Sequence, residues 1–280
     1  MNEVNRTLFI PLYGKSAVSK QHIILNDPDA ERIWAAECFP IRGKSKSKWL
    51  AYNMAMRARV FDDWTDRMLR KHPDALVLHI GCGLDSRCRR VKAPYREWID
   101  CDLPDVIEVR KEYFDEAQNY HMRALDASDP AQVALLPESD KAIVVLEGLC
   151  MYLSEEQLRG FLGALQGKYR VVRILADIYT KFGAKASKYR NPVNDVGVTT
   201  LYGIDDMEDV ISGLGLRVVR EHSFTPAALV NELRPLDRAF FKLLFTGRLY
   251  GKIYRLMELA TKKKESANGN LSRGKKQQGT

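Results

Sequence analysis

The stretch ALVLHIGCGLDSRCRRVKAPYREWIDCD, which spans residues 75–102, decides the fold. Its first apolar run predicts a buried strand over residues 76–80, and the Gly-Cys-Gly sequence at 81–83 predicts a turn directly after that strand. A short helical segment follows the turn, and residues 97–99 predict a second strand that ends in two acids. This order of elements is typical of half of a doubly wound nucleotide-binding unit.

The glycines and acids of this stretch indicate what kind of ligand it binds. Gly81 and Gly83 let the backbone turn sharply and approach a ligand closely, because neither residue has a Cβ atom. Asp100 and Asp102 follow the second strand, where a carboxylate can accept hydrogen bonds from both hydroxyls of a ribose. An adenosine-containing ligand is therefore predicted, although a Gly-x-Gly sequence also occurs in ordinary turns between a strand and a helix.

The residues after the turn distinguish between adenosine cofactors. A dinucleotide-binding fingerprint has a third glycine three residues after the second, but Ser86 stands there in this chain. Asp85 lies where a diphosphate would be, and its carboxylate would repel that group. The same acid suits a ligand that carries an ammonium and a sulfonium, so the sequence favours S-adenosylmethionine.

Composition predicts a cytoplasmic α/β protein. The chain has 280 residues, of which 45% are apolar, enough for one large α/β domain or two small ones, and one domain with an N-terminal elaboration is expected. Its five cysteines lack metal-site spacing, which predicts reduced thiols and no metal. The N-terminus shows no signal peptide, and the longest apolar stretch, residues 142–153, is interrupted by Glu147. Neither secretion nor a membrane span is expected.

Positive charge is concentrated at the C-terminus. The formal net charge is +8, and residues 262–280 hold six Lys or Arg against one Glu. Such a tail can contact nucleic acid or an anionic surface. The favoured interpretation is a solvated, disordered end, with nucleic acid not expected as a partner.

Residues 1–74 lack strand alternation and predict helices, over 27–39 and over 49–69, that form a lid before the first strand. Arg57 and Arg59 lie on the second of these helices. They can pair with the acids at positions 62 and 63 within helical reach, or one guanidinium can clamp a ligand carboxylate.

Further strands are predicted over residues 120–125, 141–146 and 170–178, since each is rich in apolar residues. Asp126 follows the first of them, and Glu147 follows the second. The carboxyl ends of parallel strands form the ligand-binding edge of open α/β folds, so both acids are candidate site residues. For Asp126, capping of the next turn is an equally good role.

The remaining elements are predicted from caps and apolar spacing. Ser154 and Gln157 form a capping box at the start of a helix. The other expectations are a helix opened by Asp129-Pro130, a loop or mobile cover over 179–203, a helix over 205–213, a strand over 215–221, and helical spacing over 227–260.

Five blocks, in this order, resemble a known family: TLFIPLYGK, MRARVFDDW, VLHIGCGLDSR, WIDCDLPDVIEVR and LEGLCMYLSEEQL. Over roughly residues 7–180 the chain resembles the leucine carboxyl methyltransferase superfamily, and within it the bacterial polyketide O-methyltransferases. The resemblance implies the Rossmann-like class I methyltransferase fold, an α/β fold with a mostly parallel seven-stranded sheet and helices on both faces. It also implies S-adenosylmethionine as the cofactor.

The resemblance implies a role for each matched residue at the methionine end of this cofactor. Arg57 would hold the methionine carboxylate with help from Lys15. Gly81 and Gly83 would face the methionine and ribose, and Glu147 would lie near the amino group.

At the other end, Asp102 would take the ribose hydroxyls and Asp126 would lie near the adenine. The predicted organisation is a helical lid over 1–74, a methyltransferase domain over 75–260 with cover segments at 179–203 and 223–260, and a basic tail over 261–280.

The expected reaction is methyl transfer to a hydroxyl or carboxylate of a small molecule, such as a polyketide. Because the sulfonium already activates the methyl group, the protein mainly has to orient the acceptor and exclude water. No catalytic base is assigned, since a phenol or carboxylate needs none. The alternatives are methylation of a protein C-terminal carboxylate and nucleic-acid binding by the basic tail.

Overall fold

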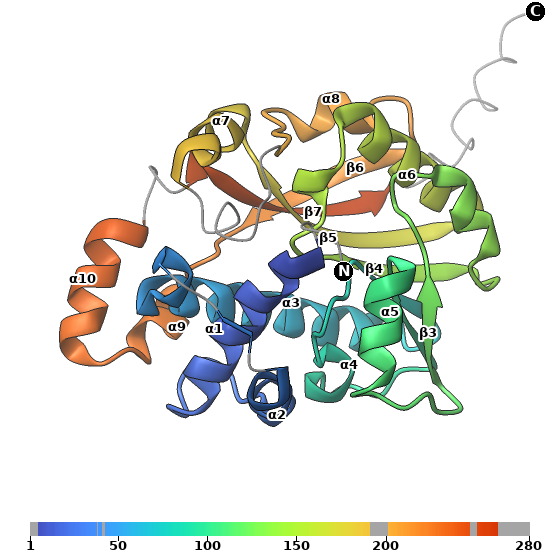
Figure 1. Ribbon diagram of the computed structural model, residues 1–280. Coiled ribbons are helices and arrows are strands. Elements are labelled where there is room, and N and C mark those ends of the chain that lie inside the picture. Colours follow the sequence, from blue (N-terminus) through green and yellow to red (C-terminus); the bar gives the residue numbers. More distant parts are fainter. Residues whose placement is uncertain (1–4, 38, 41–42, 191–200, 247–250, 263–280) are drawn as a thin grey trace, which may run out of the picture.

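The computed structural model describes residues 5–37, 39–40, 43–190, 201–246 and 251–262. A seven-stranded sheet in the order β3-β2-β1-β4-β5-β7-β6 runs through these residues, with helices on both of its faces (Figure 1). The strands are β1 (Leu76–Ile80), β2 (Glu97–Asp102), β3 (Tyr120–Ala124), β4 (Lys141–Leu146), β5 (Val171–Tyr179), β6 (Leu216–His222) and β7 (Tyr254–Thr261).

The first five strands of the sheet are parallel, and β7 pairs antiparallel with both β5 and β6. The α-helices are α1 (Phe9–Ser19), α2 (Pro28–Glu37), α3 (Lys48–Lys71), α4 (Arg87–Arg90), α5 (Pro104–Lys111), α6 (Glu155–Lys168), α7 (Lys181–Arg190), α8 (Met207–Ile211), α9 (Ala227–Asn231) and α10 (Pro235–Phe245). The fold is the predicted class I methyltransferase arrangement.

Two apolar cores lie on opposite faces of the sheet. On one face, Phe61 and Trp64 of α3 pack with residues of α1, α2 and α5. On the other face, Phe161 and Leu165 of α6 pack with residues of α8. The central strands β1 and β4 are buried between the two cores, which explains their continuous apolar sequences.

The predicted bounds of β1 and β4 are confirmed to the residue, and the long helix before β1 is confirmed as α3. The second strand, β2, is longer than predicted. It continues to Asp102 and therefore includes Asp100. The segment that Asp129 opens is a 3-10 helix, Pro130–Leu135, rather than an α-helix.

The prediction of helical spacing over residues 227–260 is wrong for its last part. Helices α9 and α10 occupy the first part, but residues 254–261 form β7. This strand is inserted between β5 and β6 and is buried on both faces, so it lacks the alternation that distinguishes a strand from a helix.

The predicted cover over residues 179–203 contains a regular helix, α7, rather than only loop. Residues 191–200 of that segment lie outside the described residues, as do Cys38 and residues 263–280 of the basic tail. Within the described ranges, no helix has the length and apolarity needed to cross a membrane, and no group of three or more His, Cys, Asp or Glu could hold a metal ion.

Replacing Ser154 with Ala is expected to lower the free energy of unfolding by about 1 kcal/mol. The Ser154 hydroxyl accepts a hydrogen bond from the Gln157 backbone N–H, and the Gln157 side chain accepts one from the Ser154 N–H, so the predicted capping box is confirmed. Urea denaturation measures the loss. The Ser154→Asp variant is the control, because Asp caps equally well; an equal loss in both variants would contradict a capping role.

Candidate functional site

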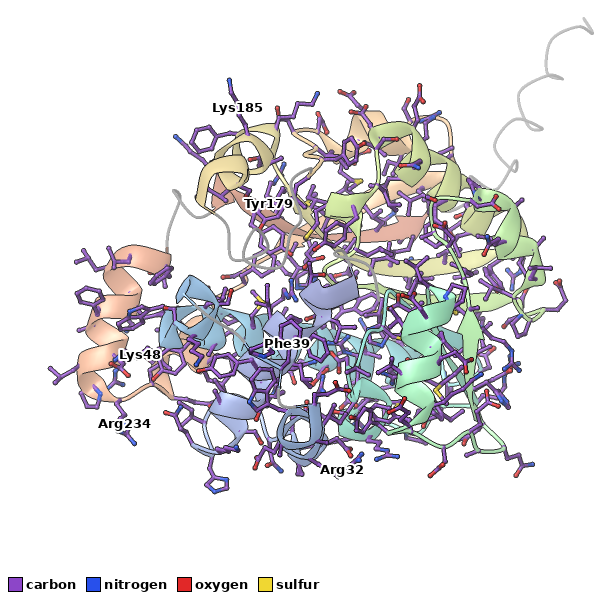
Figure 2. The ribbon with its side chains drawn as sticks, viewed as in Figure 1. Arg32, Phe39, Lys48, Tyr179, Lys185 and Arg234 are labelled. Carbon is purple, nitrogen blue, oxygen red and sulfur yellow. The ribbon has the colours of Figure 1, made fainter. Side chains whose placement is uncertain are left out.

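A cavity of about 510 Å³ opens at the carboxyl ends of β1, β2, β3 and β4 and extends to α1 and α3. Tyr179 is one of the residues that line this cavity, and Figure 2 shows it between α7 and α1. The lining includes all eight residues predicted to bind the cofactor: Lys15, Arg57, Gly81, Gly83, Asp85, Asp102, Asp126 and Glu147. The fold thus brings together residues that are up to 132 positions apart in the sequence.

The turn after β1 is a glycine turn, as predicted. Gly81 and Gly83 have φ angles of 72° and 51°, in the left-handed region that glycine adopts without strain. The backbone N–H groups of Gly81 and Cys82 donate to the Cys101 carbonyl at 2.8 and 3.1 Å, which ties the turn to β2. A Cβ atom on Gly81 would also lie 3.2 Å from the Cβ of Leu149. The turn therefore requires glycine at position 81 for conformation and for space.

Arg110 of α5 holds the other side of the turn. Its guanidinium is buried and donates to the carbonyls of Gly83 at 2.8 Å and Asp85 at 2.7 Å. It also pairs with Asp100, which accepts a further hydrogen bond from the Tyr120 hydroxyl at 2.8 Å. Asp100 is outside the cavity lining, so its predicted contact with a ribose is wrong. Its carboxylate instead fixes Arg110 beneath the turn.

Replacing Asp100 with Asn is expected to destabilise the protein in a pH-dependent way. Burial acts to raise the pKa of Asp100, but Arg110 and His79 outweigh it and lower the pKa from 3.8 to about 2. A folded-state pKa below the unfolded value means that the ionised carboxylate stabilises the fold above about pH 4, and that this contribution is lost as the pH falls towards about 2.

The difference in unfolding free energy between wild type and Asp100→Asn should therefore be constant near neutral pH and shrink as the pH falls below about 4. Urea denaturation over this pH range measures it. A difference that keeps its neutral-pH value at the lowest pH would contradict the ion pair with Arg110.

Two acids line the part of the cavity beside β2 and β3. Asp102 accepts hydrogen bonds from the backbone N–H groups of Gly83 at 2.7 Å and Leu103 at 2.8 Å, one on each carboxylate oxygen. Burial raises its pKa. Each oxygen has a second lone pair, so the carboxylate can also accept from two ligand hydroxyls. Asp126 lines the cavity and accepts from the Ser128 N–H at 2.8 Å, which is the turn-capping role predicted for it; its contact with a ligand stays a prediction.

Arg57 of α3 is buried at the cavity and spans the ends of two strands. Its Nε donates to Glu147 at 3.0 Å, and its Nη1 donates to Asp177 of β5 at 3.0 Å. Burial raises the pKa of Asp177, although Arg57 acts against this. The other predicted role, an ion pair with an acid on the same helix, is found for Arg59 rather than for Arg57. The Arg59 Nε lies 3.0 Å from the Asp63 carboxylate. Arg57 is thus the arginine of this helix that faces the site.

Arg87 connects the glycine turn to α3 and to the end of β4. Its side chain is completely buried, and its Nε donates to Asp62 of α3 at 2.7 Å. Its Nη2 pairs with Glu147 and lies 3.5 Å from Asp85. One guanidinium therefore joins three carboxylates from three different elements.

Asp85 is surrounded by protein cations. Lys15 of α1 and Arg90 of α4 each approach its carboxylate to 2.8 Å. Burial acts to raise the pKa of Asp85, but Arg90, Lys15 and Arg87 together hold it well below its usual value. Most of the charge of Asp85 is therefore already balanced within the protein, and its position beside a positively charged ligand stays a prediction.

The ion pairs around the cavity form one buried charge network. Its carboxylates are Asp27, Asp62, Asp85, Glu147 and Asp177, and its cations are Lys15, Arg57, Arg87 and Arg90. Among the described residues, four cations thus meet five carboxylates, and each of these buried groups has at least one partner of opposite charge.

The sequence analysis missed several residues of this network. A signal was present for Arg87, since DSRCRR places three arginines directly after a turn between buried strands. It was also present for Asp177, a lone acid within the apolar sequence of β5. No local signal indicated Tyr254, because the strand that contains it was predicted as a helix. The Tyr254 hydroxyl bonds to Asp177 and accepts a hydrogen bond from Arg57 at 2.9 Å.

Apart from Thr7, His79, Cys82, Ser128 and Gln157, the side chains in the rest of the cavity lining are apolar or aromatic. They come from the N-terminal helices, from the segment after β4, from β5 and β7, and from the segment before α8, and they include Leu8, Ile10, Pro11, Leu50, Met54, Met151, Tyr152, Tyr179, Tyr202 and Tyr254. Burial raises the pKa of Tyr152 to about 12, so its hydroxyl is protonated at neutral pH. This part of the cavity can exclude water from an apolar molecule.

Comparisons with known proteins agree with this geometry. The sequence model of the leucine carboxyl methyltransferase family matches residues 12–166. The chain is 30% identical over 241 residues to the tetracenomycin polyketide synthesis O-methyltransferase TcmP of Streptomyces glaucescens, covering 84% of this chain and 88% of that protein.

The chain is also 28% identical over 194 residues to the S-adenosyl-L-methionine-dependent methyltransferase dpfgK of Gibberella zeae, covering 62% of this chain and 64% of that protein. Among solved structures, a SAM-dependent methyltransferase from Anabaena variabilis superposes with a TM-score of 0.51 at 16% identity, over 74% of this chain and 84% of that chain. That likeness concerns the fold.

Proposed function

Because the chain belongs to the leucine carboxyl methyltransferase family, we propose that it transfers a methyl group from S-adenosylmethionine to a hydroxyl or carboxylate oxygen of a small, polyketide-like molecule. The chain is an S-adenosylmethionine-dependent methyltransferase. The observation that carries the finer proposal is that one cavity is lined both by the glycine turn with its charged neighbours and by apolar and tyrosine side chains.

The charged part suits the cofactor. The ribose would be held by Asp102, and Leu103 and Asp126 would border the adenine. The methionine carboxylate would lie near Lys15 and Arg57, and its amino group near Glu147. When bound, S-adenosylmethionine supplies an activated methyl group. The residues around it bind and orient the two partners and keep water out.

Glu147 and Arg57 already pair with each other at 3.0 Å, so this pair can present one negative and one positive group to the amino acid part of the cofactor. The pairing also keeps both side chains in place before a ligand arrives. Preorganised charges of this kind need little rearrangement on binding.

The apolar part suits the acceptor. A phenol or a carboxylic acid reaches its nucleophilic form at modest cost, so the site can act without a strong base. The tyrosines of the lining shape the pocket around an apolar molecule, and their rings can pack against an aromatic acceptor. No catalytic base is assigned among them.

A methyl-transfer assay tests this proposal. Purified protein is incubated with methyl-labelled S-adenosylmethionine and either aromatic phenols, small carboxylic acids or peptides with a free C-terminal carboxylate. Label is expected in the phenols or small acids. Transfer to the peptides alone would overturn the small-molecule proposal in favour of a protein carboxyl methyltransferase.

A further inference from the structure

The antiparallel strand β7 brings its first residue to the ligand-binding edge of the sheet. Tyr254, the first residue of β7, pairs with Tyr179, the last residue of β5. A parallel strand at this position would begin at the opposite edge, because parallel strands all end at the ligand-binding edge. The reversed direction of β7, which lies between β5 and β6 in Figure 1, therefore places Tyr254 in the lining of the cavity.

Tyr254 lies on the same face of the sheet as Asp177 of β5. Asp177 is two residues before Tyr179, and side chains two residues apart in a strand share a face. A long side chain can also reach its diagonal neighbour on the paired strand. The Tyr254 hydroxyl accordingly donates a hydrogen bond to the Asp177 carboxylate, which is completely buried.

The ring of Tyr254 is held in place by two other rings. It stacks on the Phe224 ring with a centroid distance of 4.6 Å and an interplanar angle of 9°, and its centroid lies 4.6 Å from that of Tyr179. Burial and the Asp177 carboxylate raise the pKa of Tyr254 well above its usual value, so the hydroxyl keeps its proton at neutral pH. The position of this hydroxyl is therefore fixed before a ligand arrives.

Tyr254 and Asp177 both contact one nitrogen of Arg57. The Arg57 Nη1 donates to Asp177 Oδ2 at 3.0 Å and to the Tyr254 hydroxyl at 2.9 Å. Because that hydroxyl donates to the same carboxylate oxygen, the three groups form a closed ring of hydrogen bonds. The other oxygen of Asp177 accepts from the Gly148 N–H at 2.7 Å. Asp177 thus ties Arg57 to the turn that follows β4.

These contacts leave one nitrogen of the guanidinium for a ligand. The Nε donates to Glu147 at 3.0 Å, and both hydrogens of Nη1 are used by Asp177 and Tyr254. None of these contacts involves Nη2, and a Cβ atom on the cavity residue Gly148 would lie 3.5 Å from this nitrogen. A ligand carboxylate can therefore accept a charge-assisted hydrogen bond from Nη2 while the other contacts of Arg57 stay in place.

We propose that Tyr254 and Asp177 are positioning residues, which orient Arg57 so that its Nη2 binds the methionine carboxylate of S-adenosylmethionine. The inference rests on the proposed function, which places that carboxylate near Arg57. Both residues act through Arg57, so the loss of either contact affects recognition of the carboxylate rather than binding of the nucleoside.

Isothermal titration calorimetry with two ligands tests this role. S-adenosylmethionine carries the carboxylate, and decarboxylated S-adenosylmethionine lacks only that group, so wild type is expected to prefer the former. The Tyr254→Phe variant keeps the ring that stacks on Phe224 but loses the hydroxyl. It is expected to bind S-adenosylmethionine about tenfold more weakly, as for the loss of one hydrogen bond to a charged group. Its affinity for the decarboxylated ligand is expected to equal that of wild type.

The matched control is Tyr169→Phe, which also removes the hydroxyl of a buried tyrosine. The Tyr169 hydroxyl donates to the Pro137 carbonyl at 3.1 Å, and the residue belongs to the core that contains α6. Its preference for the carboxylate should equal that of wild type. The Arg57→Lys variant keeps the charge but lacks the guanidinium. Adding Tyr254→Phe to it should change the preference by less than about twofold, because the hydroxyl acts through the guanidinium.

Thermal unfolding curves like that of wild type verify that the variants are folded. An equal loss for both ligands in Tyr254→Phe, or no loss for either, would overturn the positioning role and leave the cofactor assignment in place. Equal affinity of wild type for the two ligands would separate the carboxylate from Arg57 and would also overturn the inference. Binding of neither ligand by wild type would overturn the proposed function, and this inference with it.

Discussion

Replacing Arg87 with Met is expected to lower the free energy of unfolding by about 3–5 kcal/mol, because a buried charge network then loses a central cation. The Arg87 side chain is completely buried and pairs with Asp62 and Glu147, with Asp85 at 3.5 Å. Methionine fills much of the same volume, so the loss comes mainly from the carboxylates left without this partner. Few single substitutions of a surface residue approach this size.

Urea denaturation followed by tryptophan fluorescence measures the effect, since Trp64 and Trp98 are completely buried. Arg89→Met is the matched control, because this neighbouring arginine pairs with Asp29 while 46% exposed. Its loss should be below about 1 kcal/mol. Similar losses in the two variants would show that the network does not stabilise the fold in the way the geometry indicates.

Replacing Asp102 with Ala is expected to weaken S-adenosylmethionine binding by about a hundredfold. A hydrogen bond to a charged group contributes about 1.5–3 kcal/mol, and removal of the carboxylate takes away two acceptors for the ribose. The backbone N–H groups of Gly83 and Leu103 also lose their acceptor, which loosens the glycine turn. Both effects act in the same direction.

Isothermal titration calorimetry measures the dissociation constant for the Asp102→Ala variant and for a control, Glu108→Ala. Glu108 is an exposed acid of α5 that pairs with Lys111, so its removal should leave cofactor binding unchanged. An Asp102→Ala variant that binds with the wild-type constant would remove Asp102 from the site.

Much of the fold could be predicted because its signals are local. The apolar runs of β1 and β4 are continuous since helices cover both faces of the sheet, and their bounds are confirmed. The capping box of α6 needs only Ser154 and Gln157, three residues apart. For β7 the sequence YRLMELAT is misleading, because Arg255 and Glu258 interrupt its apolar residues three positions apart, a spacing that is typical of a helix rather than of a buried strand.

In the candidate site, too, the residues with a local sequence signal could be predicted and the residues without one could not. Gly81, Gly83, Asp102 and Glu147 follow predicted strands, so the sequence places them at one edge of the sheet. The partners of Arg57 could not be predicted from its helix, since Asp177 lies 120 residues away. For the same reason, the sequence could not indicate that Lys15 and Arg90 surround Asp85.

The division into a helical lid over residues 1–74 and a catalytic domain remains a proposal, and the structure suggests how such a lid would work. Lys15 of α1 contacts Asp85, and Arg57 of α3 contacts Glu147. Both contacts join the N-terminal helices to the ligand-binding edge of the sheet. A ligand that competes for these charges would thereby couple its binding to the position of the lid.

A crystal structure of the chain with S-adenosylhomocysteine tests the central claim most directly. The account predicts one bound molecule in the cavity, with its ribose on Asp102, its adenine between Leu103 and Asp126, and its amino acid part beside Arg57 and Glu147. Density for the ligand at any other place, with this cavity filled only by solvent, would contradict the account.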